Sequence, residues 1–300
     1  MIRILITGVE GFIGSALAWK LHEEHEVVGI DYLRVREKTN LPKDVNYINH
    51  DLSVPFFFGT NPDVVMHYAV ISQEVVSNNP ELEQVNIKAM LNVLEFCRKG
   101  NVPLVFPSSC SIYGPGVLHK TSDAKDPKSL YAVGKLSCEE YAKFYHHAFG
   151  LDVVILRYSN VYGDTTYIEN KFYPGKKDVA RIFVEHALAD EPLPVIDGTQ
   201  TRDWTFIDDC VEGTVKFISL KGLSVVNVAT GVETNINRFA EMVAEALGWE
   251  LKVRKVPNRK IDNIPRRSLD ITGVSDLWRP KWKLETGLKE YAKRMKETTC

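Results

Sequence analysis

Cysteine is scarce in this 300-residue sequence, and its five cysteines include no Cys-x-x-Cys pair. This spacing argues against a disulfide framework, so we expect a reduced, cytoplasmic protein. His146 and His147 are adjacent but lack cysteines or carboxylates at ligand spacing, and we predict no metal. No apolar run approaches the roughly 20 residues that span a bilayer. Because a strand pattern begins at Ile2, we expect neither a signal peptide nor a membrane partner.

A charge excess of one sign is also missing. The 37 Lys and Arg residues nearly balance the 39 Asp and Glu residues, for a formal net charge of −2. A basic surface of the kind that binds nucleic acid is therefore not indicated, and we predict no nucleic-acid partner. Repeats and low-complexity tracts are absent from the sequence as well, which leaves an ordinary globular enzyme or binding protein.

The most informative stretch is a glycine-rich turn between a short buried strand and an apolar-periodic helix over 12–21. Gly8 would allow the tight turn, Gly11 the approach of phosphates, and Gly14 close packing of helix and strand. A helix N-terminus attracts anions through its free N–H groups and its dipole. Asp31, roughly 20 residues further on, would bind the adenosine ribose and repel a 2′-phosphate. The pattern therefore favours NAD over NADP.

Alternating strand and helix patterns predict an α/β fold, a Rossmann-type doubly wound parallel sheet. Further strands are expected at 27–31, 46–50, 63–70, 103–107 and 152–157, with long helices at 80–100 and 129–150. Later helices are expected at 178–189, 209–220, 237–247 and 284–297, and short strands at 193–196, 225–229 and 251–256. We predict an NAD-binding domain over residues 1–165 and a smaller C-terminal α/β substrate-binding lobe, mainly over 166–300, some of which could return to the first domain.

A candidate catalytic pair stands on the predicted helix at 129–150. Tyr131 and Lys135 are four residues apart, which places both side chains on one helix face. A tyrosine, with an ordinary pKa near 10, needs a nearby positive charge to act as a base at neutral pH. Lys135 would supply that charge, and Ser109, at the end of the preceding strand, could bind the same substrate oxygen.

These residues belong to a longer series of motifs that runs along nearly the whole chain. In order they are TGVEGFIG (7–14), Asp31, Asp51-Leu52, HYA (67–69), Asn86, SSCSIYG (108–114), YAVGK (131–135), RYSNVYG (157–163), RDWTFIDD (202–209) and RSLD (267–270). With them the sequence resembles the extended short-chain dehydrogenase/reductases, in the branch of nucleotide-sugar epimerases and dehydratases that includes UDP-galactose 4-epimerase. The resemblance implies NAD as cofactor and a nucleotide-diphosphate sugar, with a UDP-sugar favoured, as substrate.

The resemblance also implies roles for single residues. Tyr131 would be the catalytic acid/base, with Ser109 and Lys135 as its catalytic partners. At the cofactor pyrophosphate, contacts are implied for Gly8, Gly11, Phe12, Ile13 and Gly14. Asp31 would contact the adenosine ribose, and Asp51 and Leu52 the adenine. Contacts with the remaining part of the cofactor are implied for Ala69, Ser108, Tyr131, Lys135 and Tyr158. Substrate contacts are implied for Ser109, Asn160, Arg202, Arg267 and Asp270. Arginines suit a diphosphate, because they form forked, charge-assisted hydrogen bonds.

Two departures from the family pattern bear on the reaction. Sugar 4,6-dehydratases place an Asp-Glu pair directly after the catalytic Ser or Thr, where this sequence has Cys110 and Ser111. Dehydration is therefore disfavoured, although Cys110 could act as a weak acid. The second departure is Asp164, which follows Tyr162-Gly163 where the family usually has proline. The shape of the substrate loop after it, over 164–177, is left open.

We predict an NAD-dependent nucleotide-sugar 4-epimerase, acting through Tyr131 and a 4-keto intermediate, and a homodimer built on the helices at 80–100 and 129–150. UDP-hexoses, UDP-glucose and UDP-galactose among them, are the predicted substrates. The alternatives within the family are a sugar dehydratase, a reductase or dehydrogenase, and a decarboxylase. A non-catalytic dinucleotide-sensing protein is a further alternative, disfavoured because such proteins typically lose the Tyr or the Lys and this chain keeps both.

Overall fold

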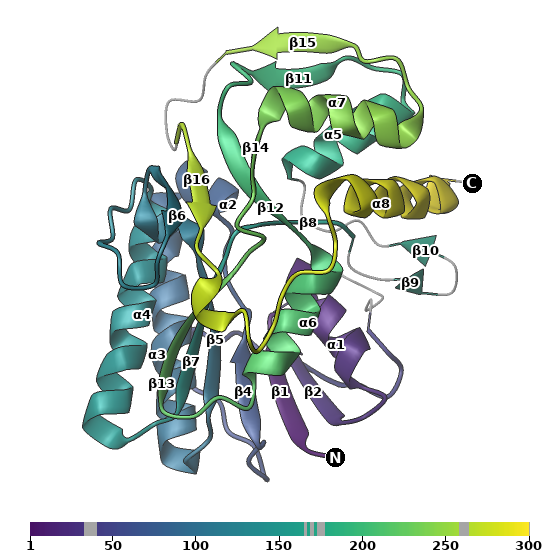
Figure 1. The fold of residues 1–300 in the computed structure, drawn as a ribbon. Coiled ribbons are helices and arrows are strands. Elements are labelled where there is room, and N and C mark those ends of the chain that lie inside the picture. Colours follow the sequence, from purple (N-terminus) through teal and green to yellow (C-terminus); the bar gives the residue numbers. More distant parts are fainter. Residues whose placement is uncertain (33–40, 165–166, 169–170, 173–177, 258–263, 300) are drawn as a thin grey trace.

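A seven-stranded parallel sheet forms the centre of the computed structural model (Figure 1). The structure describes residues 1–32, 41–164, 167–168, 171–172, 178–257 and 264–299. The strands lie in the order β3 (Asn46–Asn49), β2 (Glu26–Asp31), β1 (Arg3–Thr7), β4 (Val64–His67), β5 (Leu104–Ser109), β7 (Val153–Tyr158) and β13 (Leu223–Val228). The strand order reverses between β1 and β4, which confirms the predicted doubly wound fold. Ligands of such sheets bind at the carboxyl ends of the strands near this reversal.

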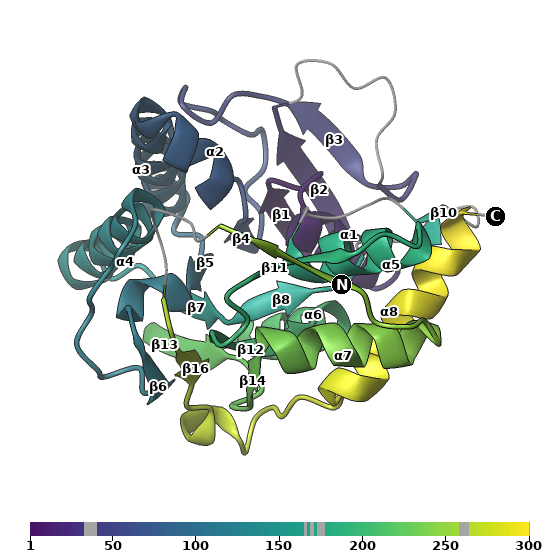
Figure 2. The ribbon, with the colours of Figure 1, turned by 90° about the horizontal axis from the view of Figure 1, so that it is seen from above.

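Helices cover both faces of this sheet, as Figure 2 shows from above. On one face lie α1 (Phe12–Leu21) and α6 (Ile207–Phe217), and on the other α3 (Glu83–Gly100) and α4 (Leu130–Phe149). Alternate residues of β1 supply the two cores, because successive strand side chains point to opposite faces. Ile4 and Ile6 pack in the cluster that includes α1 and α6 residues, whereas Leu5 packs in the cluster of α3 and α4.

The predicted helix at 129–150 is observed as α4, and its ends follow the rules of helix capping. Ser129 is its N-cap, and the hydroxyl accepts the N–H of Ala132 at 3.2 Å. Gly150 ends it with φ of 71°, the left-handed conformation that glycine adopts without strain. The predicted helix at 80–100 is instead divided into a 3-10 turn, η1 (Pro80–Leu82), and α3. A short helix, α2 (Gln73–Asn78), precedes it and was not predicted.

Most of the C-terminal half forms a smaller lobe beyond the carboxyl ends of the sheet strands, at the top of Figure 1. Its helices are α5 (Val179–Leu188), α7 (Ile236–Leu247) and α8 (Leu284–Thr299), and its parallel strands are β11 (Leu193–Ile196) and β15 (Val253–Val256). Each of these matches a predicted element to within a few residues. The stretch 164–177, expected to be irregular, contains the antiparallel pair β9 (Tyr167–Ile168) and β10 (Lys171–Phe172). The rest of its course lies outside the described residues.

Short strands connect the two parts and were not predicted. β12 (Thr201–Phe206) pairs with β8 (Asn160–Tyr162) and β14 (Glu233–Asn235), and β16 (Arg267–Leu269) pairs with β6 (Gly116–His119). Remaining short elements are the 3-10 turns η2 (Cys110–Tyr113) and η3 (Thr272–Val274). Chain beyond residue 165 also returns to the large sheet, since α6 covers it and β13 extends it. We therefore propose that the NAD-binding domain comprises 1–165 together with α6 and β13.

Among the described residues, no helix has the length and apolar character needed to cross a membrane.

Candidate functional site

The glycine-rich turn joins β1 to α1 at the point where the strand order reverses. Gly8 has φ of +69°, and a side chain there would overlap the main chain of Tyr68 and Ala69. A side chain at Gly14 would overlap the carbonyl oxygen of Gly8. No side chain caps α1 at Gly11, and its first turn carries no acidic residue. The N-terminal N–H groups of α1 are therefore available to an anion, which fits a pyrophosphate.

The predicted acidic residue lies beside this turn. Asp31 ends β2, and its carboxylate accepts the main-chain N–H groups of Glu10 and Tyr32 at 2.9 and 2.8 Å. Asp51 follows β3 and accepts the N–H of Ser53 at 2.8 Å. The carboxyl edge of neighbouring strands thus brings Asp31 and Asp51 to the same side as the glycine turn.

Four more predicted cofactor residues belong to this region. Leu52 is buried, and its carbonyl accepts the Asn92 side chain at 2.8 Å. Ala69 follows β4, and its N–H lies 3.4 Å from the Thr7 hydroxyl. Phe12 and Ile13, at the start of α1, are partly buried against the core. Together with the turn, these residues line the edge from β3 to β4, and they could hold a dinucleotide.

Tyr131 and Lys135 stand on α4, and Ser109 ends β5, the strand next to β4 in the sheet. Lys135 is buried and donates to the Pro107 carbonyl at 2.7 Å, and its Nζ lies 5.8 Å from the Tyr131 ring centroid. The Ser109 hydroxyl accepts both the N–H and the hydroxyl of Ser111, at 3.1 and 2.9 Å. A hydroxyl has one proton and two lone pairs, so Ser109 can still donate to a further oxygen.

Burial shapes the ionisation of the Tyr131–Lys135 pair. It raises the pKa of Tyr131 above its ordinary value, and the nearby Cys110, Glu83 and Cys138 act in the same direction. It lowers the pKa of Lys135 to about 8. At pH 7 the tyrosine is therefore a phenol and the lysine is mostly an ammonium. A phenolate at Tyr131 requires additional positive charge close by, which a bound oxidised nicotinamide ring would supply.

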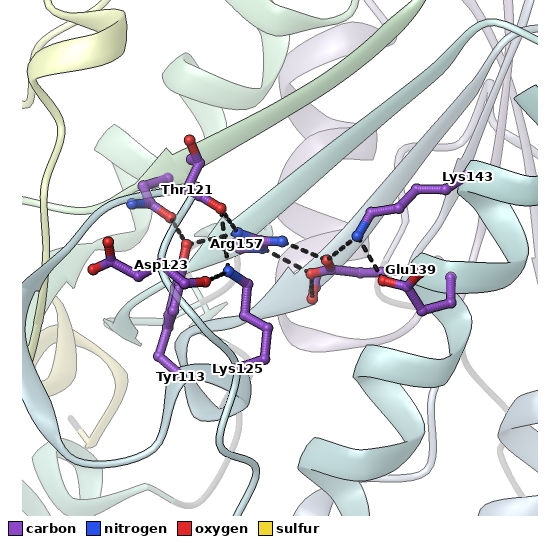
Figure 3. A network of polar contacts seen from close by, with 10 residues as sticks. Tyr113, Thr121, Asp123, Lys125, Glu139, Lys143 and Arg157 are labelled. Atoms are coloured by element: carbon purple, nitrogen blue, oxygen red, sulfur yellow. Dashed lines mark hydrogen bonds and ion pairs between the residues drawn. The ribbon is translucent and has the colours of Figure 1, made fainter. Parts of the chain in front are cut away.

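A buried network anchors α4, which carries Tyr131 and Lys135, to the sheet (Figure 3). The Arg157 guanidinium on β7 donates to both Glu139 oxygens, at 2.9 and 2.6 Å. Its NH1 donates to the Tyr113 hydroxyl and to the Thr121 carbonyl, both at 2.8 Å. Glu139 also accepts the Ser108 hydroxyl at 2.5 Å. Every nitrogen of the guanidinium is bonded, so this arginine is a structural residue.

The same network changes the interpretation of two predicted cofactor residues. The Ser108 hydroxyl is bound to Glu139, on the α4 side of the sheet. The Tyr158 hydroxyl lies 2.6 Å from the hydroxyls of both Tyr68 and Thr214, in the core. Both hydroxyls are therefore bonded within the protein, and a hydrogen bond of either side chain to a cofactor would have to replace or add to these contacts.

Arg267 is buried like Arg157 but lacks its partners. It is 6% exposed, and its Nε and NH1 have no hydrogen-bond partner among the described residues. It stands on β16, which packs beside η2, the turn that follows Ser109. A buried, unsatisfied guanidinium is costly unless an anion completes it. Arg267 therefore fits a phosphate group of a substrate.

Of the other predicted substrate residues, Asn160 and Arg202 lie on strands, and Asp270 directly follows β16. Asn160 is on β8, paired with Trp204 of β12. Arg202, also on β12, donates to the Thr201 and Ile264 carbonyls at 2.7 and 2.8 Å. Asp270 accepts the Thr272 N–H at 2.8 Å, which lowers the pKa of its carboxyl. Strand β12 pairs with β8 and lies beside β16, so these residues stand on neighbouring segments, although Arg202 and Asp270 also serve the local fold.

Asp164, where the resemblance leads us to expect proline, is 3% exposed. Neither carboxylate oxygen has a hydrogen-bond partner in the described part of the chain, and Arg294 lies 3.6 Å away. Burial raises the pKa of this carboxyl to about 6, and Arg294 only partly offsets the effect.

Three contributors to the site went without a role in the sequence-based prediction. His67 ends β4, and its Nδ1 lies 2.7 Å from the Thr7 hydroxyl. Burial and the charge of Lys135 lower the pKa of His67 to about 3, so it is neutral. Asn86, on α3, bonds both main-chain groups of Ile71, at 2.7 and 3.2 Å. All three stand in the motifs that carry the resemblance, at 7–14, 67–69 and 86, but the motifs alone gave them no role.

Comparison with known proteins places the chain among enzymes. Residues 4–229 match the model of the NAD dependent epimerase/dehydratase family. The chain belongs to this family. It is therefore an enzyme of sugar-nucleotide epimerase type, and NAD is its cofactor, as predicted. Among the described residues no cluster of His, Cys, Asp and Glu is placed to hold a metal ion.

Members of the family with several activities are similar to this chain. A putative UDP-glucose 4-epimerase of Methanocaldococcus jannaschii is 32% identical over 98% of each chain. UDP-glucuronic acid decarboxylase 6 of Arabidopsis thaliana is 30% identical over 95% of this chain and 86% of its own. The crystal structure of a Thermotoga maritima UDP-glucose 4-epimerase with UDP-glucose superposes with a TM-score of 0.90, at 28% identity over the whole of both chains. The likeness supports nucleotide-sugar chemistry and leaves the exact reaction open.

Proposed function

We propose that this chain is an NAD-dependent UDP-sugar 4-epimerase. The observation that carries the proposal is the arrangement of Ser109, Tyr131 and Lys135, with Cys110 and Ser111 following the serine. Dehydratases of the family carry an Asp-Glu pair at those two positions. The Ser111 hydroxyl donates to Ser109, so this turn has a positioning contact where a dehydratase would have its acids.

In the proposed reaction Tyr131 takes the proton of the sugar 4-hydroxyl and later returns it. Ser109 donates to the same oxygen, and Lys135 favours the phenolate of Tyr131 by its positive charge. NAD, when bound by the glycine turn and Asp31, supplies hydride transfer. Arg267 and Arg202 would bind the diphosphate, which leaves the sugar free to present either face once it is the 4-keto form.

Support for the diphosphate contact comes from Arg267. Its Nε and NH1 have no hydrogen-bond partner among the described residues, and phosphate oxygens accept the forked bonds that a guanidinium offers. UDP rather than another nucleotide rests on the relatives, whose names specify UDP-sugars.

The test is a product assay on purified protein without added NAD. UDP-glucose, UDP-galactose, their N-acetyl counterparts and UDP-glucuronate would be offered, and products resolved by NMR of the anomeric proton. Interconversion at C4 is expected, and Tyr131→Phe should lower turnover by about 10²–10⁴-fold. Loss of carbon dioxide from UDP-glucuronate would assign a decarboxylase instead. Near-normal turnover of Tyr131→Phe would refute the role of that residue.

We also propose a homodimer through α4. Leu130, Val133, Tyr141 and Phe144 are exposed at 43, 45, 38 and 56%, and their helical spacing places them in one stripe. An exposed apolar stripe of this kind is typical of an interface. Sedimentation should show a dimer that Phe144→Glu dissociates. Phe57→Glu, at a phenylalanine exposed elsewhere, is the control that should leave it intact.

A further inference from the structure

We propose that Glu83 is a positioning residue of the active site, which joins the helix of Tyr131 and Lys135 to the loop after β4. The inference rests on the proposed function in so far as it takes Tyr131 and Lys135 as the reacting pair. Its structural basis is the packing of Glu83, the first residue of α3, against a position on α4 that has no side chain.

Glu83 is a buried acid whose position is defined by one amide. It is 7% exposed, and its Oε2 accepts the Asn86 side-chain N–H at 3.0 Å. Asn86 in turn accepts the N–H of Ile71 and donates to its carbonyl. Ile71 is two residues after Ala69, the predicted cofactor contact. Glu83 thus holds the amide that fixes this loop.

The other carboxylate oxygen of Glu83 lies against α4. A side chain at Gly134 would overlap Glu83 Oε1 and approach its Cγ to 3.0 Å. Gly134 stands between Tyr131 and Lys135 on the same helix. A glycine inside a helix costs roughly 1 kcal/mol relative to alanine, so its presence here requires a compensating contact. The Glu83 carboxylate, which fills the space, is that contact.

An acid in the first turn of a helix has an ordinary role, because it interacts favourably with the helix dipole. Glu81, in η1 just before α3, is exposed and free to play that role from the surface. The dipole does not explain why Glu83 is buried, bonded to Asn86 and fitted to a glycine of the neighbouring helix. Burial and these two contacts together indicate a specific position rather than a general charge effect.

The Glu83 carboxylate also contributes charge at the reacting pair. It raises the pKa of Tyr131 and that of Lys135, so it disfavours a phenolate and favours the ammonium. The other titratable groups that act on this pair are Cys110 from η2, Cys138 and Glu139 from α4, and His67 from β4. Among them, Glu83 is the acid contributed by α3.

A two-residue swap tests the contact without any need for activity. Gly134→Ala should lower the melting temperature by forcing the carboxylate out, although alanine is the better helix former. Glu83→Ala/Gly134→Ala should melt above Gly134→Ala, because the space is then free for the methyl group. Additive effects of the two changes would show that the residues do not interact and would overturn the proposal.

The positioning role is tested on the NAD-loaded protein. Glu83→Gln keeps the shape and the bond to Asn86 but removes the charge, so the acidic limb of the kcat/KM profile should move to lower pH. Glu83→Ala should lower kcat roughly ten-fold with little change in KM, and Gln should restore most of it. Glu81→Gln is the matched control and should change neither quantity. A purely structural role would leave kcat and both pH limbs as in the wild type, which would refute the proposal.

The role of Glu83 can also be tested if the proposed epimerase function is wrong. If the wild-type protein turns over no UDP-sugar, the ionisation of Tyr131 can be followed as an ultraviolet difference spectrum against Tyr131→Phe, with NAD bound. Glu83→Gln should still make this ionisation occur at lower pH. An unchanged titration would refute the role of Glu83, whatever the reaction is.

Discussion

Arg157 and Arg267 are both buried, at 1% and 6% exposure, yet they differ in every contact. Arg157 is bonded through all its nitrogens to Glu139, Tyr113 and Thr121. Arg267 has two nitrogens without a partner among the described residues. Burial of a cation is costly in both places, but within the fold only Arg157 is compensated. The difference separates an arginine that is satisfied within the protein from one that we propose binds a phosphate of the substrate.

The largest effect on stability is expected when the buried Arg157–Glu139 ion pair is broken. Arg157→Met leaves Glu139 buried without its guanidinium, which should lower the free energy of unfolding by about 3–5 kcal/mol. Urea denaturation measures it. The double variant Arg157→Met/Glu139→Leu should recover much of the loss, since no uncompensated charge then remains. A loss below about 1 kcal/mol for the single variant would contradict the structural role of Arg157.

Arg267→Met should behave in the opposite way. The free energy of unfolding should stay within about 0.5 kcal/mol of the wild type or rise, because few internal bonds are lost. Affinity for UDP should fall about 10–100-fold, the effect of losing hydrogen bonds to a charged group. Calorimetric titration measures it. Arg266→Met, at an exposed neighbour paired with Glu233 at 2.6 Å, is the control that should bind UDP normally.

The comparison of satisfied and unsatisfied buried groups extends to carboxylates, for which a smaller effect on stability is expected. The pKa of the Asp164 carboxyl is raised from 3.8 to about 6 in the folded protein. Between these two pH values the carboxyl is therefore protonated in the folded protein and ionised in the unfolded chain. Stability should therefore fall as the pH rises from about 4 to 6 and stay lower above it. Asp164→Asn should remove this slope and be more stable by roughly 1–3 kcal/mol at pH 7.5. Thermal denaturation across this pH range tests it.

Asp203 provides the contrasting carboxylate for that experiment. Its two oxygens accept the N–H groups of Thr230, Gly231 and Leu269 and the Thr230 hydroxyl, at 2.7 to 3.3 Å. An amide cannot accept all of these bonds, so Asp203→Asn should destabilise the protein at every pH. Equal behaviour of the two Asn variants would mean that hydrogen-bond satisfaction does not distinguish the two positions.

The parts of the fold that sequence predicts well are those whose signals are local. The glycine turn and the apolar period of 12–21 identify α1 residue for residue, and Ser129 and Gly150 mark the ends of α4. Strands β6 and β16 gave no such signal. They have three or four residues each and exist only because Arg267 pairs with Gly116, far away in the chain.

Side-chain direction is the part of the predicted site that the sequence motifs do not specify. Ser108 and Ser109 are neighbours on β5, and a strand turns successive side chains to opposite faces. Ser108 bonds Glu139 of α4, whereas Ser109, the last residue of the strand, accepts the Ser111 hydroxyl. Arg157 and Tyr158 repeat the pattern on β7, with Glu139 on one face and Thr214 on the other. The motif names both members of each pair, but only the sheet shows which way each points.

The return of the chain to the large sheet has a consequence for solubility. Strand β7 is buried along its whole length, and β13, which lies later in the chain between segments of the smaller lobe, covers its outer edge. A fragment that ends at residue 165 would expose the outer edge of this otherwise buried strand, with its unpaired N–H and C=O groups. Such an edge is a template for intermolecular β-pairing, so this fragment should aggregate rather than fold. The last strand added to the sheet therefore protects the NAD-binding half from self-association.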